Sequence, residues 1–298
     1  MHTPAAVLFA LLTTASNALA TVLQRKAARR VPAADGLRWS LITRLVHQRV
    51  WLAGIAATGA AACFQALALA NGALSVVQPV FVLELPIALL LAGVILRRRL
   101  SAEVWRATGC ITVGLGVALW AASPTAGHGS AVPAGRWVLV LVCCLGAAAF
   151  LTATAAARPP GAVRAACLAL AAAIGYALTA ALLKTSALRW EADGIRGFFT
   201  AWQTYGFAAV GVASLFLLQN ALQSGSLVFS QPALTLGDAG TSVALGAVLY
   251  GERIRGGWWA AVELAGSALI LLGLVLLSRS PLAHELTAPE PEPEPARH

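Results

Sequence analysis

The chain has 298 residues, of which 59% are hydrophobic and only 11% are charged. Its mean hydropathy is +0.77, so it has too few polar side chains to coat a water-soluble particle, and we expect a polytopic membrane protein. The formal net charge is +9, but no basic stripe with interleaved aromatic residues and no nucleic-acid-binding motif accompanies it, which argues against nucleic acid as a partner.

Nine apolar runs of roughly 18 residues or more, the length needed to span a bilayer, predict nine transmembrane helices. We expect an all-α membrane protein with spans at residues 5–23, 51–70, 76–96, 104–122, 137–155, 165–183, 203–221, 227–250 and 257–277. The first run contains Ala18-Leu19-Ala20, which resembles a signal-peptide cleavage site. Lysine and arginine follow this run and do not precede it, however, so we expect a retained helix.

Three connecting segments have distinctive compositions. Residues 36–51 carry Arg38 and Arg44 among apolar residues, which predicts an amphipathic helix in the headgroup region. Residues 123–135 are rich in glycine and proline, and we expect a loop that separates two halves of the chain. The tail 281–298 is rich in proline and glutamate, so we expect it to be extended and disordered.

The distribution of lysine and arginine predicts the orientation. If the amino terminus lies outside, most of the 21 basic residues fall on the cytoplasmic side, as the positive-inside rule requires. We therefore expect a multi-pass protein of the cell (plasma) membrane with its amino terminus outside and its carboxyl terminus in the cytoplasm.

The two halves of the chain resemble each other. Six residues of the stretch 72–100 recur in order in the stretch 225–254: Gly72, Leu74, Gln78, Pro79, Leu83 and Gly93 correspond to Gly225, Leu227, Gln231, Pro232, Leu236 and Gly246. The single helix between the halves turns the second copy upside down, which predicts an inverted-topology repeat. We expect a first four-helix repeat at 1–122, a loop and linker helix at 123–160, a second, inverted four-helix repeat at 161–278 and a tail at 279–298.

These features resemble the drug/metabolite transporter superfamily with EamA-type repeats. The resemblance is carried by the nine-helix plan, the long basic loop after the first helix, the paired helices with Gln-Pro, and the Gly-Glu-Arg-Ile turn at 251–254. Typical members have five helices per repeat, whereas this chain lacks the second helix of each copy, which is closer to the magnesium-transporter (NIPA-type) branch. The Gly-Glu-Arg turn is degenerate at the equivalent Arg97, Arg98 and Arg99.

Two carboxylates lie near the middle of equivalent helices. Glu84 falls in the third span and Asp238 in the eighth, and a charged group at this depth is by default a functional hypothesis. Pro86 frees a carbonyl in the third span, and glycines on both sides of Asp238 should loosen the eighth. Interrupted helices of this kind hold substrate and ion sites in transporters. The alternative is that each carboxylate is protonated or paired with a hydroxyl such as Thr241 and serves only packing.

Other polar residues are candidate substrate or ion ligands. Gln78 and Gln231 each precede a proline and could bind substrate or bond the neighbouring backbone. A different choice, between a ligand and a helix-to-helix hydrogen bond, applies to four further residues in or near spans: Asn17, Gln65, Tyr176 and Asn220. We expect Glu263 to pair with Lys184 or Arg253, and Glu252 to offset one of the arginines beside it.

Together these features predict a secondary active transporter that exports a small metabolite, drug-like molecule or amine by alternating access, with proton coupling as one mode. One alternative is a divalent-cation transporter of the magnesium type, which would bind weakly because only two or three acidic ligands are present. Another is a membrane anchor or assembly partner without transport activity, supported by the acidic tail. A flippase for lipids or lipid-linked sugars also stays open.

No catalytic or phosphate-binding motif occurs in the sequence, and the five cysteines show no metal-ligand spacing. We therefore expect neither enzyme activity nor a cofactor nor a bound metal. The expected partners are a small-molecule or ion substrate and membrane lipids, and a homodimer is an open alternative to a monomer.

Overall fold

The computed structural model describes residues 3–28, 48–95, 100–125, 132–224 and 227–278. Within these residues the fold is all-α, and nine helical spans are long and apolar enough to cross a membrane. This confirms the predicted fold class and the predicted number of spans. The predicted interfacial segment before residue 48, the arginine run at 97–99 and the acidic tail lie outside the described residues.

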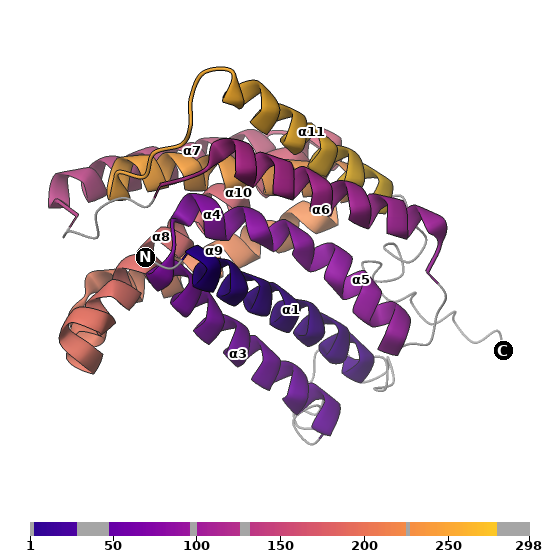
Figure 1. Ribbon diagram of the computed structural model, residues 1–298, viewed down its shortest axis with the longest axis horizontal. Coiled ribbons are helices and arrows are strands. Elements are labelled where there is room, and N and C mark those ends of the chain that lie inside the picture. Colours follow the sequence, from indigo (N-terminus) through magenta and orange to yellow (C-terminus); the bar gives the residue numbers. More distant parts are fainter. Residues whose placement is uncertain (1–2, 29–47, 96–99, 126–131, 225–226, 279–298) are drawn as a thin grey trace.

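The helices (Figure 1) lie close to the predicted runs, except that α8 extends well beyond its run. Their bounds are α1 Thr3–Ala28, α3 Arg49–Asn71, α4 Leu74–Val80, η2 Phe81–Leu83, α5 Glu84–Ile95, α6 Ala102–Ala122, α7 Ala134–Ala156, α8 Ala162–Thr200, α9 Trp202–Ser224, α10 Leu227–Tyr250 and α11 Trp259–Ser278. Large apolar side chains such as Val142, Phe150 and Val212 are exposed, as expected for helices whose outer faces meet lipid.

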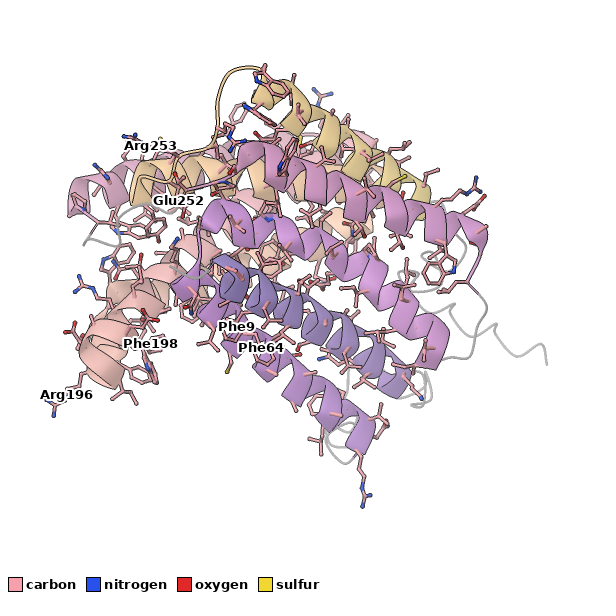
Figure 2. The ribbon with its side chains drawn as sticks, viewed as in Figure 1. Phe9, Phe64, Arg196, Phe198, Glu252 and Arg253 are labelled. Atoms are coloured by element: carbon pink, nitrogen blue, oxygen red, sulfur yellow. The ribbon has the colours of Figure 1, made fainter. Side chains whose placement is uncertain are left out.

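Three helix pairs and one central helix organise the bundle. α1 packs on α3, α6 on α11, and α8 on α9, while α8 also contacts α10, α7 and α3. Phe9 of α1 stacks on Phe64 of α3, with 6.4 Å between ring centroids (Figure 2). The inner positions of α8 are mostly alanines with 0 or 1% exposure, and small residues let helix backbones approach closely in a membrane.

The third predicted span is interrupted. α4 ends at Val80, the 3₁₀ turn η2 follows, and α5 begins at Glu84. Pro86 has no amide to bond the carbonyl of Val82, which explains why the regular α-helical pattern is lost just before it. The expected weakening of the helix at Pro86 is thus confirmed, and it puts Glu84 at the start of a new helix in the middle of the span.

The eighth predicted span is not interrupted, so the expected loosening around Asp238 is wrong. α10 is a continuous helix from Leu227 to Tyr250. Gly237 instead allows α8 to approach, because a Cβ at this position would lie 2.5 Å from Leu170 Cδ1 and 2.8 Å from Ala173 Cβ.

The sixth predicted span is longer than expected. α8 continues past the apolar run to Thr200, with a break at Gly194, where φ is 65° and ψ is −154°. The part before the break, residues 162–193, corresponds to about 48 Å at 1.5 Å per residue, well beyond the roughly 30 Å of the hydrocarbon layer. Arg189, Asp193 and Arg196 are exposed on the continuation, which therefore extends beyond the membrane-spanning part.

The pair α6–α11 packs through glycines. A Cβ on Gly114 would lie 2.7 Å from the carbonyl oxygen of Gly266 and 2.9 Å from the amide nitrogen of Ile270. A Cβ on Gly273 would lie 2.8 Å from the carbonyl oxygen of Ala107. The two backbones are therefore in direct contact, with no side chain between them.

Replacing Gly114 by alanine should destabilise the protein. We expect Gly114→Ala to lower the free energy of unfolding by about 1–3 kcal/mol, because the new methyl group clashes with backbone atoms of α11. The measurement is the thermal unfolding midpoint of the purified protein in detergent. Gly116→Ala is the matched control, because Gly116 is exposed on the same helix with no atom within 4 Å of its Cβ position and gains the same helix propensity. Equal midpoints for the two variants would contradict the close contact.

Candidate functional site

Glu84 lies where the third span changes from 3₁₀ to α-helical structure. Its carboxylate is half-buried, and Oε2 accepts a long hydrogen bond of 3.5 Å from Asn17 Nδ2 of α1. α1 contacts α4, η2 and α5, so the amide of Asn17 reaches the carboxylate from a neighbouring helix. Two of the predicted ligands thus lie together.

Asp238 lies in the middle of α10 and is also half-buried. Its Oδ1 accepts a hydrogen bond of 3.3 Å from Gln78 Nε2 of α4. Gln78 is only 4% exposed, and its Oε1 is a buried acceptor without a partner among the described residues. This unpaired oxygen beside a carboxylate leaves one hydrogen-bonding position open for a donor or a cation.

Tyr176 of α8 lies in the neighbourhood of both carboxylates, since α8 packs against α10 and also contacts α4. We call these five residues from five helices the central polar cluster: Asn17, Gln78, Glu84, Tyr176 and Asp238. All five are predicted ligands, and the two carboxylates lie near mid-span on α5 and α10. Tyr176 is half-buried, so the cluster is not sealed by apolar side chains.

The other three predicted ligands make no hydrogen bond to this cluster. Asn220 Nδ2 donates to the Phe216 carbonyl of its own helix at 2.8 Å, so this hydrogen bond is neither to the cluster nor to another helix. Gln65 and Gln231 make no side-chain hydrogen bond to any residue in the described part of the chain.

A second polar group, not predicted from the sequence, lies where α3 ends and α4 begins, which we call the Gly72 end of the bundle. Glu252 is 5% exposed and accepts hydrogen bonds from Leu74 N (2.7 Å), Ser75 N (3.0 Å) and Ser75 Oγ (2.7 Å). The N-cap residue Ala73 makes no side-chain cap, so the Glu252 carboxylate satisfies the free amides at the start of α4.

Lys184 completes this group. It is 4% exposed, and its Nζ lies 2.8 Å from Glu252 Oε1 and 2.9 Å from the Gly72 carbonyl oxygen. The ammonium also lies 4.5 Å from the centroid of the Tyr250 ring, within range of a cation–π interaction. We call the contacts of Lys184, Glu252, Tyr250, Gly72 and Ser75 the Lys184–Glu252 network.

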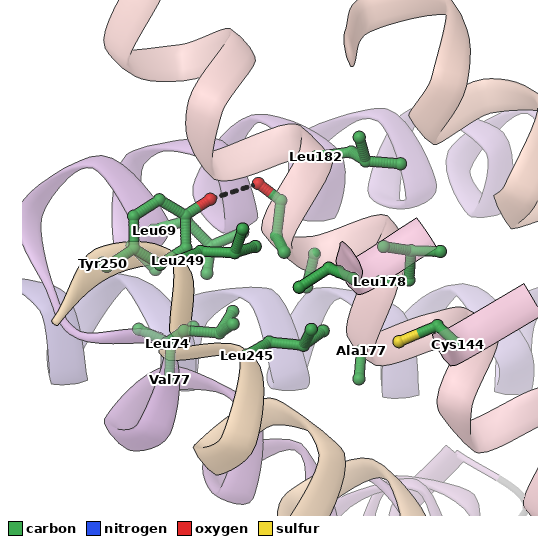
Figure 3. Packing of buried hydrophobic residues seen from close by; sticks show 14 of the residues in the cluster. Leu69, Leu74, Val77, Cys144, Ala177, Leu178, Leu182, Leu245, Leu249 and Tyr250 are labelled. Atoms are coloured by element: carbon green, nitrogen blue, oxygen red, sulfur yellow. Dashed lines mark hydrogen bonds between the residues drawn. The ribbon is translucent and has the colours of Figure 1, made fainter. Parts of the chain in front are cut away.

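Tyr250 is held in place by two further hydrogen bonds. Its hydroxyl donates to the Ala181 carbonyl at 2.6 Å, drawn as the dashed line in Figure 3, and lies 2.9 Å from Thr185 Oγ1. Around it, Leu69, Leu74 and Leu249 form part of the apolar core. The network is therefore enclosed by packed side chains.

The local sequence explains how Glu252 turns inward. Gly251 adopts a left-handed φ of 66° and ends α10, as glycine commonly does after a helix. A Cβ on Gly246 would clash with the Glu252 carboxylate, so this glycine leaves the space that the carboxylate fills. Arg253, the next residue (Figure 2), is exposed, and its backbone pairs with Thr125.

Two predictions about charge pairing are therefore wrong. Glu252 does not offset a neighbouring arginine, because its carboxylate binds Lys184 and the start of α4. Glu263 does not pair with Lys184, whose ammonium is taken by Glu252, and it has no ion-pair partner among the residues that the structure describes.

Comparison with known proteins finds a distant relative. The chain is 29% identical over 283 residues to an uncharacterised protein of Corynebacterium glutamicum, an alignment that covers 92% of this chain and 95% of the relative. No model of a known protein family matches the chain, and no solved structure matches it. The comparison thus shows a distant homologue that aligns over most of both chains, without a family assignment.

Removing the charge of Glu252 should cost far more stability than removing another membrane carboxylate. We expect Glu252→Gln to lower the free energy of unfolding by about 3–5 kcal/mol, because it leaves Lys184 as a buried charge without its counter-charge. The matched control is Glu263→Gln, and thermal unfolding in detergent is the measurement.

The double variant Lys184→Met with Glu252→Gln separates charge from packing. Since it removes both charges, we expect it to unfold at a higher temperature than Glu252→Gln alone. A Glu252→Gln variant as stable as the Glu263→Gln control would show that the network does not stabilise the fold.

Proposed function

We propose that the protein is a secondary active transporter of the drug/metabolite type that moves a small cationic molecule or an ion through the bundle. The observation that supports this most is the central polar cluster, in which two half-buried carboxylates from distant parts of the chain lie near mid-span, each bonded to a side-chain amide. A carboxylate at this depth costs at least a few kcal/mol, and neither Glu84 nor Asp238 has a cationic partner among the described residues.

The chemistry of the cluster suits a cation. Carboxylate oxygens and the unpaired Oε1 of Gln78 are acceptors, and the Tyr176 ring adds a π face and a hydroxyl. A bound cation or proton would neutralise the charge of a carboxylate. The bundle can then rearrange around the site at a lower free-energy cost, because an uncompensated charge is unfavourable in apolar surroundings. Exchange of a proton for a cationic substrate at Glu84 and Asp238 is therefore the mechanism we propose.

The helix arrangement supports alternating access. The pair α1–α3 in the first half has a counterpart in α8–α9 of the second half, and α6–α11 joins the fourth helix of one half to that of the other. With the sequence repeat, this is consistent with two inverted four-helix units that rock about a central site. The Lys184–Glu252 network would keep the Gly72 end closed, since it ties the start of α4 to α8 and to the end of α10.

Transport by purified protein in liposomes tests the proposal. The assay measures uptake of organic amines, neutral metabolites, anionic metabolites and Mg²⁺, each with and without an imposed pH gradient. We expect uptake of at least one cationic compound, faster with a pH gradient. Uptake of Mg²⁺ alone would instead favour the divalent-cation alternative.

Two variants and a matched control assign the site. Glu84→Gln and Asp238→Asn should each lower the transport rate roughly tenfold or more, because each removes a charge that contacts the cation. Glu263→Gln should transport like the unmodified protein, because Glu263 lies in α11, outside the cluster. Unchanged thermal unfolding of all three variants would show that the loss is not misfolding. Full transport activity in both cluster variants would contradict the site assignment.

A further inference from the structure

A cavity of about 500 Å³ lies apart from the central polar cluster, between the start of α7, the last part of α8 and the start of α9. Its volume is within the range of ligand pockets, roughly 300–1,000 Å³. Its lining includes the apolar side chains of Trp137, Val138 and Leu141 of α7, and the charged side chains of Arg189 and Asp193 of α8. The cavity therefore joins an apolar surface to two opposite charges.

The cavity lies at the boundary between hydrocarbon and water. Trp137 is in the first turn of α7 and Trp202 is the first residue of α9, and tryptophans at span ends mark the interface. Their rings contact each other edge to face, with 5.3 Å between centroids. Val138 is 61% exposed, so the apolar lining continues onto the lipid-facing surface of α7.

Four polar side chains of the cavity lack partners among the described residues. Arg189 and Asp193 lie one helical turn apart, yet they form no ion pair with each other or with any other described residue. Gln203 is 7% exposed, and its side-chain amide makes no hydrogen bond within the described part of the chain. Trp137 is 4% exposed, and its Nε1 is a buried donor without a partner among the described residues. Buried polar groups are normally bonded, so the buried Trp137 and Gln203 indicate a missing ligand, and the exposed Arg189 and Asp193 beside them are free to bind it.

The turn between the last part of α8 and the start of α9, which lines the cavity, is stabilised by contacts within this segment. The left-handed φ of 65° at Gly194 redirects the chain after the charged part of α8. At Gly197 a Cβ would lie 2.5 Å from the Arg189 carbonyl oxygen, so only glycine allows this close return. Thr204 Oγ1 donates to the Phe198 carbonyl at 2.5 Å, which fixes the start of α9 against the end of α8.

From these observations we infer that the cavity binds one membrane phospholipid whose headgroup carries both a phosphate and a primary ammonium, as in phosphatidylethanolamine. The planar guanidinium of Arg189 matches a phosphate, with the Gln203 amide as a further donor. The Asp193 carboxylate binds the ammonium. One acyl chain follows Val138 and Leu141 into the bilayer. An anionic headgroup without an ammonium leaves Asp193 without a counter-charge, so the site selects the zwitterion.

Native mass spectrometry of the full-length protein in detergent tests this site. The protein is titrated with phosphatidylethanolamine, with phosphatidylglycerol and with soluble phosphoethanolamine. We expect one tightly bound phosphatidylethanolamine per chain and weaker binding of phosphatidylglycerol. Soluble phosphoethanolamine should not displace the lipid, because it lacks the acyl chains. Equal competition by the soluble headgroup would overturn the assignment to a lipid.

Two variants distinguish the roles of the charges. Arg189→Ala should weaken binding of both lipids at least about tenfold, as expected for a lost charge-assisted hydrogen bond. Asp193→Asn should remove the preference for phosphatidylethanolamine and leave phosphatidylglycerol bound as well as before or better.

Arg196→Ala is the matched control. Arg196 is an exposed arginine on the same segment (Figure 2), and it is not among the residues that line the cavity. We expect this variant to bind both lipids like the unmodified protein. If Arg189→Ala and Asp193→Asn bind lipid like Arg196→Ala, only non-specific annular lipid is present and the proposed site is wrong. Transport activity plays no part in this test.

Discussion

The buried ion pair of Lys184 with Glu252 constrains much of the rest of the structure. Two charges removed from water are stable only when every remaining donor and acceptor is satisfied. Here that requirement brings together three segments: the turn before α4, the middle of α8 and the turn after α10. Because Glu252 also caps α4, the pair fixes where that helix starts. The position of η2, and with it the depth of Glu84, follows from this start.

The central polar cluster depends on an interrupted helix at Pro86 and on a continuous, closely packed helix at Gly237. Pro86 interrupts one span, so that Glu84 begins a helix near mid-span and meets Asn17. Gly237 leaves the other span intact but lets α8 approach α10, which brings Tyr176 near Asp238. Five helices thus contribute to one group of side chains, although only two hydrogen bonds connect its members.

The transmembrane spans could be predicted from the sequence, but most contacts between them could not. A span depends on about twenty consecutive apolar residues, which is a local property, and the effect of Pro86 is local too. Glycine in a helix can serve flexibility or close packing, and only the position of α8 shows that Gly237 serves packing. The partner of Glu252 is 68 residues away, and no local pattern distinguishes it from the adjacent arginines. Similarly, the apolar run predicted a span that ends at residue 183, whereas α8 continues because charges outside the membrane do not prevent a helix.

The glycine contact between α6 and α11 has a consequence for how the chain can change during evolution. Where two backbones touch, no side chain can adopt another rotamer to absorb an added methyl group, so Gly114, Gly266 and Gly273 have no conservative replacement. Neighbouring lipid-facing positions such as Gly109 and Gly116 have no such restriction. Sequence drift on these two helices should therefore be confined to their outer faces, and the seam between them should be among the slowest-changing parts of the protein.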